Sequence, residues 1–403
     1  MNKPAISFVA IAGVALALPA IAQESVLYSF NPEADGNPEG RLLLVGKNTL
    51  FGTTEGQGDS PGTVFELKQS GNAWTESTQV IFDGTNGLYP AAGLIADANG
   101  NLYGTTSSAG TYNGGTVFEL TNTNGTWNLQ TLWYFGNTAI HDGDTPVCDL
   151  LMDSTGAIYG TTEQGGTSNM GTVFKLTNSG GTWTESVLYN FAGGSDGDFP
   201  VAGLAMDSSG ALYGTTYYGG GSGTCNIGCG TVFELAPNGN GWNESVLHAF
   251  GNGTDGQFPG YGQLLLSSSG MLYGTTGSGG TDDWGLVYQL TPSGGKWKEK
   301  ILHNFGAAGD GAGPDSGLLK GASGAMYGTT ELGGANGGGT VYALTKANGG
   351  WTEDLVTSFP NFTGDGFYPH GGVILDKKSE TLYGGTSQGG TGGWGTVYEV
   401  VLP

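Results

Sequence analysis

The chain alternates apolar and polar residues in short runs, and glycine, asparagine, aspartate or serine separates one run from the next. Residues 101–120 read NLYGTTSSAGTYNGGTVFEL, a short aromatic run, a glycine-rich gap and an alternating run. Alternation with a period of two, rich in β-branched and aromatic residues and bounded by turn formers, is typical of β-strands. No stretch carries a capped helical pattern of useful length. The sequence therefore predicts an all-β protein.

This unit occurs seven times along the chain. Its aromatic residue precedes Gly-Thr-Thr, or Gly-Gly-Thr in the last copy, and consecutive copies start 52 to 60 residues apart. The seven aromatic residues are Phe51, Tyr103, Tyr159, Tyr213, Tyr273, Tyr327 and Tyr383. A regular period of this length is the sequence signature of a propeller or a solenoid.

Each copy contains four strand-like runs, which we call A, B, C and D. In the third copy they cover residues 149–153, 158–162, 171–176 and 183–191, with the glycine-rich gap between B and C. Four antiparallel strands in each of seven copies match a seven-bladed β-propeller. All-β architecture in one domain over residues 23–403 is the resulting prediction.

The two ends of the chain support a closed ring. The last copy stops after its C run, residues 396–401, and has no D run behind it. Residues 25–30, SVLYSF, resemble the D run SVLYNF of residues 186–191. We therefore expect the N-terminal strand to complete the seventh blade, which would remove an exposed sheet edge.

Residues 1–22 differ from the rest of the chain. Lys3 precedes an apolar run from Ala5 to Leu18, and Ala20-Ile21-Ala22 is a small-x-small cleavage site. This arrangement predicts a secretory signal peptide, because the apolar run is short for a membrane span. We expect the mature protein to be secreted or periplasmic, without membrane insertion after cleavage.

Composition and charge exclude several classes of protein. Gly accounts for 80 of 403 residues, but it shows no Gly-X-Y period and Pro numbers only 15, which excludes collagen. The net charge is −23, with 12 basic and 35 acidic residues. Binding to nucleic acid or to anionic membranes requires a basic surface, so neither is expected. The charge instead favours a soluble protein, which we expect to be a monomer.

The tandem unit LYGTT–x–GG–x–GTVFEL resembles the GloVer tandem repeat, which is found in exported bacterial proteins. The resemblance covers residues 25–403 and is specific, because seven copies agree in both motif and spacing. It implies export and a repeat architecture. Many members carry a C-terminal anchor, and this chain departs from them because it stops directly after a strand-like run.

Function is expected on the face that holds the B–C gaps and the D–A connections, since these are longer and more varied than the opposite turns. Candidate ligand-binding residues in the gaps are Trp284, Trp394, Tyr112, Tyr217, Tyr218, Glu55, Glu163 and Glu331. Aromatic faces beside carboxylates suit sugar rings or cationic ligands. The alternative is that the aromatic side chains only pack over the blade tops.

The D–A connections carry the motif Asp-Gly-x-x-Pro or a close variant in every copy. The aspartates of the five full motifs are Asp142, Asp196, Asp255, Asp310 and Asp365. Asp and Gly favour a turn, and Pro stiffens the entry to strand A, so a structural role is the first interpretation. The functional alternative is a ring of Ca²⁺ ligands. No copy has the D-x-D-x-D spacing of a self-sufficient calcium loop.

Two of the three cysteines, Cys225 and Cys229, lie in the longest B–C gap. Export favours a local disulfide between them, whereas a zinc site would need two further ligands. Cys148 fills the position of Ala202 in the next copy and is expected to be a buried small residue.

No catalytic residue can be assigned from the sequence. His248 and His303 take the D-strand position of Tyr28 and Tyr189, which indicates a structural slot. The chain has no G-x-S-x-G, H-E-x-x-H or P-loop motif. A resident cofactor is likewise not expected.

The leading hypothesis is a non-catalytic binding or scaffold module whose partner is a glycan or another extracellular polymer. The first alternative is a carbohydrate-active hydrolase or lyase that uses carboxylates on the B–C/D–A face. The second is a structural cell-surface component. An enzyme would release soluble sugar, a binding module would only co-sediment with the polymer, and a structural component would self-assemble.

Overall fold

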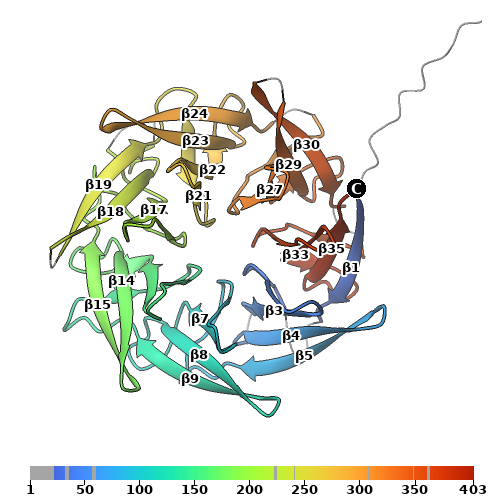
Figure 1. The fold of residues 1–403 in the computed structure, drawn as a ribbon, viewed down its shortest axis with the longest axis horizontal. Coiled ribbons are helices and arrows are strands. Elements are labelled where there is room, and N and C mark those ends of the chain that lie inside the picture. The colour runs from blue at the N-terminus through green and yellow to red at the C-terminus, as the bar shows by residue number, and fades with distance from the viewer. Residues whose placement is uncertain are drawn as a thin grey trace, which may run out of the picture.

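The protein is a closed ring of seven blades around a central axis, as Figure 1 shows. The structure, a computed structural model, describes residues 22–31, 36–56, 60–221, 225–239, 241–306, 308–347, 349–360 and 364–403. Each blade is a four-stranded antiparallel sheet, and the described residues contain no helix. The predicted seven-bladed propeller is confirmed. The predicted signal peptide, residues 1–22, falls on residues outside the described part except for Ala22.

The strands of each blade run from the axis outward in the order A, B, C, D. Blade 1 contains β2 (Leu43–Val45), β3 (Thr49–Thr54), β4 (Thr63–Ser70) and β5 (Ala73–Ile81). Blade 2 contains β6 (Ile95–Ala96), β7 (Leu102–Thr106), β8 (Thr116–Thr123) and β9 (Thr126–Tyr134). Blade 3 contains β11 (Leu151–Met152), β12 (Ile158–Thr162), β14 (Thr172–Ser179) and β15 (Thr182–Asn190). Blade 4 contains β16 (Ala205–Met206), β17 (Leu212–Thr216), β18 (Thr231–Asn238) and β19 (Gly241–Ala249). Blade 5 contains β21 (Leu265–Leu266), β22 (Leu272–Gly279), β23 (Leu286–Ser293) and β24 (Lys296–Asn304). Blade 6 contains β26 (Leu319–Lys320), β27 (Met326–Thr330), β29 (Thr340–Ala347) and β30 (Gly350–Ser358). Blade 7 contains β32 (Val373–Asp376), β33 (Thr381–Thr386), β35 (Thr396–Val401) and β1 (Gln23–Ser29).

The ring closes through its first strand. β1 pairs antiparallel with β35, with Ser25 opposite Glu399 and Val26 opposite Tyr398. In Figure 1 the blue N-terminal strand lies beside the red C-terminal ones. The closure expected from the offset of the two termini is therefore confirmed.

Among the described residues, part of the glycine-rich gap pairs with the D–A connection that leads into the same blade in six blades, in two of them only through the single bridges Leu88–Ser108 and Asp198–Tyr218. The sequence did not predict this pairing. The short strands involved are β10 (Gly143–Asp144) with β13 (Gln164–Gly165), β25 (Gly311–Ala312) with β28 (Leu332–Gly333), β31 (Gly366–Phe367) with β34 (Gln388–Gly389), and β20 (Gly256–Pro259) with β22. These pairs tie the two kinds of loop together on one face of the ring.

The repeated motif is explained by contacts inside each blade. The glycine of strand B lies under the strand C aromatic ring, and a Cβ there would come within 2.4 to 2.7 Å of a ring atom in all seven blades. The last Thr of strand B bonds the first Thr of strand C, for example Thr54 to Thr63 at 2.8 Å. Six blades contain this buried Thr pair, and Leu286 replaces the second Thr in blade 5.

Hydrophobic side chains pack between neighbouring blades, in interfaces that we call seams and number by the blades they join. Seven buried clusters fill the seven seams, and the cluster at seam 1/2 includes Phe51, Phe82 and Phe118. Because each cluster draws on two blades, a single blade cannot bury its apolar surface alone. The core of this protein is therefore a circle of seams.

Proline and glycine of different blades interlock at every seam. The proline that ends each Asp-Gly-x-x-Pro motif packs on the glycine before Thr-Val in the preceding blade, such as Pro200 on Gly171. That glycine has a φ of 83 to 97° in all seven blades. A Cβ on it would lie 2.4 to 2.9 Å from the proline ring. Only glycine fits this backbone and this contact.

Among the described residues, no helix has the length and apolar character needed to cross a bilayer.

Candidate functional site

A cavity of about 640 Å³ lies at the centre of the ring, where the A strands converge. All seven blades contribute to its wall, through residues 39–41, 91–92, 147, 149, 151, 205–206, 261–266, 315–320, 370–371 and 373 together with Glu55 and Glu163. In each blade the D–A connection leads into strand A, so residues of the connection line the mouth of the cavity and residues of the strand line its interior. Polar residues precede the strands and apolar ones lie on them, so the cavity has a polar mouth and an apolar interior.

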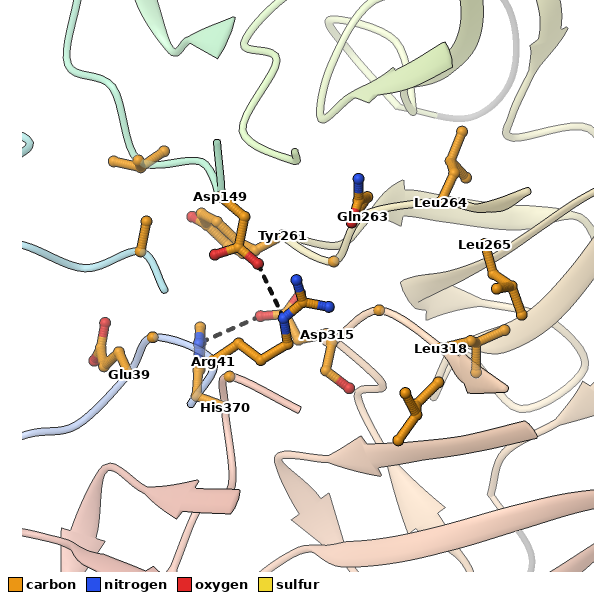
Figure 2. A pocket seen from close by; sticks show the side chains of 18 of the residues that line it. Glu39, Arg41, Asp149, Tyr261, Gln263, Leu264, Leu265, Asp315, Leu318 and His370 are labelled. Carbon is orange, nitrogen blue, oxygen red and sulfur yellow. Dashed lines mark ion pairs between the residues drawn. The ribbon is translucent and has the colours of Figure 1, made fainter. Parts of the chain in front are cut away.

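The polar mouth is a ring of side chains that we call the cavity ring: Glu39, Arg41, Glu55, Asp149, Glu163, Tyr261, Gln263, Asp315 and His370. Figure 2 shows most of them with their two ion pairs. Arg41 Nε lies 3.3 Å from Asp149 Oδ2, and His370 Nε2 lies 3.4 Å from Asp315 Oδ2. These pairs link blade 1 with blade 3 and blade 7 with blade 6. Each joins residues far apart in sequence.

Glu39 and Glu55 form a pair of carboxyl groups beside one amide. Asn37 Nδ2 donates to Glu39 Oε1 at 2.9 Å and to Glu55 Oε2 at 3.1 Å. The two oxygens are therefore at most about 6 Å apart. Burial, and then repulsion by Glu39, raises the pKa of Glu55 to about 7. One of the two groups is thus able to hold a proton near neutral pH.

His370 carries the positive charge that faces these carboxyl groups. Burial by itself lowers its pKa, but the hydrogen bond and charge of Asp315, with Glu39 and Glu331, raise it to about 9. The imidazole is therefore protonated at neutral pH. The ring of Tyr261 lies 5.8 Å from it, centroid to centroid.

The three predicted glutamates converge on this site. Glu55 and Glu163 line the cavity, and Glu331 lies close enough for the charge of His370 to act on its pKa. Burial raises the pKa of Glu163 and of Glu331 above the usual value. All three follow the Thr pair of strand B, in blades 1, 3 and 6, which places them at equivalent positions around the axis.

The predicted aromatic residues separate into two groups. Tyr217 reaches the cavity ring, since its ring centroid is 6.3 Å from that of Tyr261, and it packs on Phe258 and Tyr218. Tyr112, Trp284 and Trp394 are not among the residues that line the cavity. Tyr112 and Trp284 are about half exposed, at 48% and 49%. Trp394 is partly buried against the seam 7/1 cluster.

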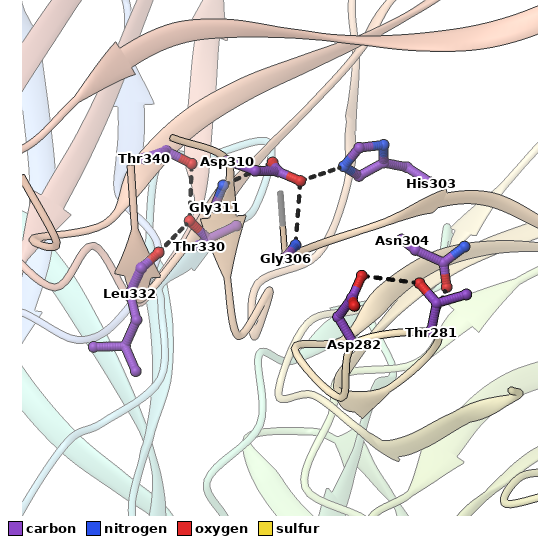
Figure 3. A network of polar contacts seen from close by, with 10 residues as sticks. All are labelled: Thr281, Asp282, His303, Asn304, Gly306, Asp310, Gly311, Thr330, Leu332 and Thr340. Carbon is purple, nitrogen blue, oxygen red and sulfur yellow. Dashed lines mark hydrogen bonds and ion pairs between the residues drawn. The ribbon is translucent and has the colours of Figure 1, made fainter. Parts of the chain in front are cut away.

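The Asp-Gly-x-x-Pro aspartates lie at the seams and are not brought together. Asp196 accepts from the Tyr189 hydroxyl at 2.6 Å, and Asp310 contacts His303 Nε2 at 3.1 Å, as in Figure 3. Asp255 has the same contact with His248. His248 and His303 thus occupy the Tyr189 slot, as the sequence predicted. Asp142 is buried, which raises its pKa to about 6, and Asp365 is exposed.

The three cysteines take the states that the sequence predicted. Cys225 and Cys229 form a disulfide, and Cys148 is a buried free thiol. The sulfur of Cys148 accepts from the Thr161 amide and contacts its carbonyl oxygen. Burial raises the pKa of this thiol to about 11, which keeps it protonated.

Sequence reasoning missed Glu39, Arg41, Asp149, Tyr261, Gln263 and Asp315. A usable pattern was present, because the residue after the motif proline differs in nearly every copy: Glu39, Ala91, Val147, Val201, Gly260, Asp315 and His370. Positions that vary in a repeat whose other positions agree are where function is expected. This column of the repeat would have identified Glu39, Asp315 and His370 of the cavity ring.

Comparison with known proteins identifies the family and the fold. The sequence profile of the Gloeobacter/Verrucomicrobia repeat matches residues 11–227 and 223–403. A suggested 6-phosphogluconolactonase of Bacteroides uniformis superimposes with a TM-score of 0.50 at 13% identity, covering 84% of this chain and 86% of that one. A protein from Lactobacillus plantarum gives 0.52 at 15% identity, covering 80% and 85%. At these identities the likeness concerns the fold alone. No curated protein matches the sequence.

Proposed function

The chain belongs to the Gloeobacter/Verrucomicrobia repeat family, and we propose that this member is an exported binding module that takes a sugar unit of a glycan into the central cavity. The cavity ring carries the proposal, because carboxylates and an aromatic ring converge there on one ligand-sized space. Its volume of about 640 Å³ is within the usual range for small-molecule sites.

The chemistry of the cavity ring suits a polyhydroxylated ligand. Glu39, Glu55 and Glu163 offer oxygen acceptors to hydroxyl groups, and the Gln263 amide donates to Leu204 oxygen while keeping its own oxygen as an acceptor. Tyr261 is 45% exposed and offers an aromatic face to the C–H side of a sugar ring. An anionic ligand is disfavoured, since Arg41 and His370 are already paired with carboxylates.

Binding to a panel of polysaccharides and oligosaccharides, followed by co-sedimentation and calorimetry, tests the proposal. Tyr261→Ala should weaken binding at least tenfold, while the exposed Trp284→Ala should leave it unchanged. A combined Trp284→Ala and Trp394→Ala variant examines the loop-tip alternative. Loss of binding in that variant alone would move the site to the loop tips, and no retained glycan with any polymer would refute the proposal.

A carbohydrate-active enzyme is the second candidate, and one observation favours it. Glu39 and Glu55 form a pair of carboxyl groups with oxygens at most about 6 Å apart, and glycosidases act through a pair of carboxyl groups. A carboxyl group whose pKa is raised to about 7 beside a second carboxyl group is the arrangement that such chemistry uses.

The two candidates differ in a product assay. An enzyme releases soluble sugar from the bound polymer, and Glu55→Gln or Glu39→Gln should abolish that release while much of the binding remains. A binding module retains the polymer without any release by the wild-type protein.

A further inference from the structure

Two neighbouring seams each hold a histidine, an aspartate and a glutamate close together. At seam 4/5 these are His248, Asp255 and Glu299, and at seam 5/6 they are His303, Asp310 and Glu353. In each group one imidazole nitrogen and one oxygen of each carboxylate all lie within 4.8 Å of one another. Figure 3 shows His303 and Asp310 of the second group.

Each group is assembled from two blades. The histidine is the next-to-last residue of strand D of one blade, the aspartate follows in the D–A connection, and the glutamate lies on strand D of the next blade. Asp255 is 7% exposed, and His248 and its equivalent His303 have side chains only 19% and 21% exposed. The groups are therefore shielded, so they differ from the acidic clusters that occur on open protein surfaces.

The carboxyl pair occurs at other seams, but the histidine does not. At seam 2/3 Asp142 lies close enough for its charge to raise the pKa of Glu185, and at seam 3/4 Asp196 does the same to Glu244. At these two seams the strand D position that holds histidine elsewhere is occupied by Trp133 and Tyr189, and both are poor metal ligands. Among the described residues, only seams 4/5 and 5/6 complete a His-Asp-Glu set.

Polar atoms beside these two sets have no partner in the protein. Oε1 of Glu299 and Oε1 of Glu353 are buried without a hydrogen bond, as is Oε1 of the equivalent Glu24, Glu185 and Glu244 at seams without histidine. The phenol oxygens of Tyr288 and Tyr342 are also unpartnered, and both side chains are fully buried. The charges of Glu299 and Asp255 act on Tyr288, and those of Glu353 and Asp310 act on Tyr342. Blades 1 to 4 have Phe at this position. Blade 7 has Tyr398, whose buried hydroxyl is also unpartnered although seam 6/7 has Thr357 in place of the histidine, so the histidine is what distinguishes seams 4/5 and 5/6.

We infer that seams 4/5 and 5/6 are two equivalent binding sites for a divalent transition-metal ion of the zinc class, with one imidazole and two carboxylates as protein ligands. Two adjacent carboxylates that are at least partly buried repel each other and are poorly solvated, and a cation between them would reduce both the repulsion and the desolvation cost. The unpartnered glutamate oxygens supply ligand atoms that no protein donor occupies.

The distances and ligand types favour this class of metal over Ca²⁺. Ligands 2.0–2.1 Å from a tetrahedral ion are separated by about 3.3 Å, and the nitrogen–oxygen distance is 3.1 Å in both seams. Imidazole is a common ligand of zinc, whereas Ca²⁺ takes six to eight oxygens. Asp255 and Asp310, predicted as calcium candidates, are thus assigned to a different ion. The ion would link blades 4, 5 and 6 across their seams.

The experiment measures zinc bound to the untagged protein after treatment with chelator and readdition of Zn²⁺ alone. We expect two equivalents for each chain and a higher melting temperature with zinc than with chelator. The variants His248→Tyr and His303→Tyr reproduce the Tyr189 arrangement of seam 3/4, which keeps the hydrogen bond to aspartate and removes the ligand nitrogen. Each single variant should lose one equivalent, and the double variant both.

Two further variants separate a metal site from a hydrogen-bonded cluster. Glu299→Gln with Glu353→Gln keeps the side-chain shape and should weaken zinc binding at least tenfold. His141→Asn, at an exposed histidine outside both sets, should retain two equivalents. Failure of the wild-type protein to bind zinc, or full zinc binding by the folded double histidine variant, would overturn the inference.

Discussion

The seams and the cavity ring are built from the same seven copies of one repeat, yet they use different columns of it. Seam contacts recur in blade after blade, as with Pro200 on Gly171 and its six equivalents. The position after that proline, which supplies Glu39, Asp315 and His370 to the cavity ring, has a different residue in most blades. Repetition therefore marks the residues that hold the ring together, and variation marks the residues that face the axis.

This difference predicts how substitutions behave. A seam residue interacts through packing or a hydrogen bond between blades, so its replacement should lower stability. A cavity-ring residue has part of its surface free, so its replacement should change ligand binding more than stability. The following predictions test this separation, from the largest expected effect to the smallest.

Gly171→Ala should destabilise the protein by about 3 kcal/mol or more, since a Cβ there meets Pro200 Cδ at 2.5 Å and Thr162 oxygen at 2.5 Å. Gly180→Ala in the same blade is the matched control. Gly180 also has a positive φ, 61°, but nothing lies within 4 Å of its Cβ position. We therefore expect Gly180→Ala to lower the free energy of unfolding by only about 1 kcal/mol. Urea unfolding measures both. Equal losses would show that the contact between blades contributes nothing.

Thr330→Val should cost about 2 kcal/mol, because it leaves the buried Thr340 hydroxyl without its 2.8 Å partner. Thr340→Val should cost less, about 1 kcal/mol, since Thr330 still donates to Leu332 oxygen at 2.9 Å. Figure 3 shows this chain of contacts. Blade 5 contains a natural version, in which Leu286 replaces the second Thr. If Thr340→Val lowered the stability more than Thr330→Val, the hydroxyl of Thr330 would be the donor and that of Thr340 the acceptor in this hydrogen bond.

Stability without metal should decrease as the pH rises from about 4.5 to about 7. Burial, and then the charges of Asp142 and Asp196, raises the pKa of Glu185 and Glu244 from 4.5 to about 7. The folded protein therefore holds protons that the unfolded chain has released, and this stabilisation is lost as the pH passes the folded pKa. Melting in the presence of chelator should occur a few degrees higher at pH 5 than at pH 8.

The carboxamide variants assign this pH effect to the seams. Glu185→Gln with Glu244→Gln should reduce the difference in melting temperature between pH 5 and pH 8, because an amide cannot be deprotonated. Glu55→Gln should reduce it by a smaller amount, because it removes one such group from the cavity ring. A melting temperature that rises with pH over this range would contradict the protonation of the seam carboxyls.

Local sequence determined the ring and its closure. The strand runs, the turn residues, the seven-fold period and the offset between the two ends lie in stretches of a few residues. The strands formed by residues 158–162 and 183–191 of the third copy appear in the structure with shifts of at most one residue. The glutamates after the Thr pair were found in this way, since Glu55, Glu163 and Glu331 stand at one position of the repeat.

Only the tertiary structure decided which side chains meet at the axis and in the seams. The contact of Arg41 with Asp149 spans more than a hundred residues, and Asp255 meets Glu299 because closure of the ring sets one blade against the next. Such contacts depend on the radius of the ring and on the tilt of each blade, which no single repeat contains. The sequence specified the blade, whereas the assembled ring determined the cavity and the two His-Asp-Glu sets.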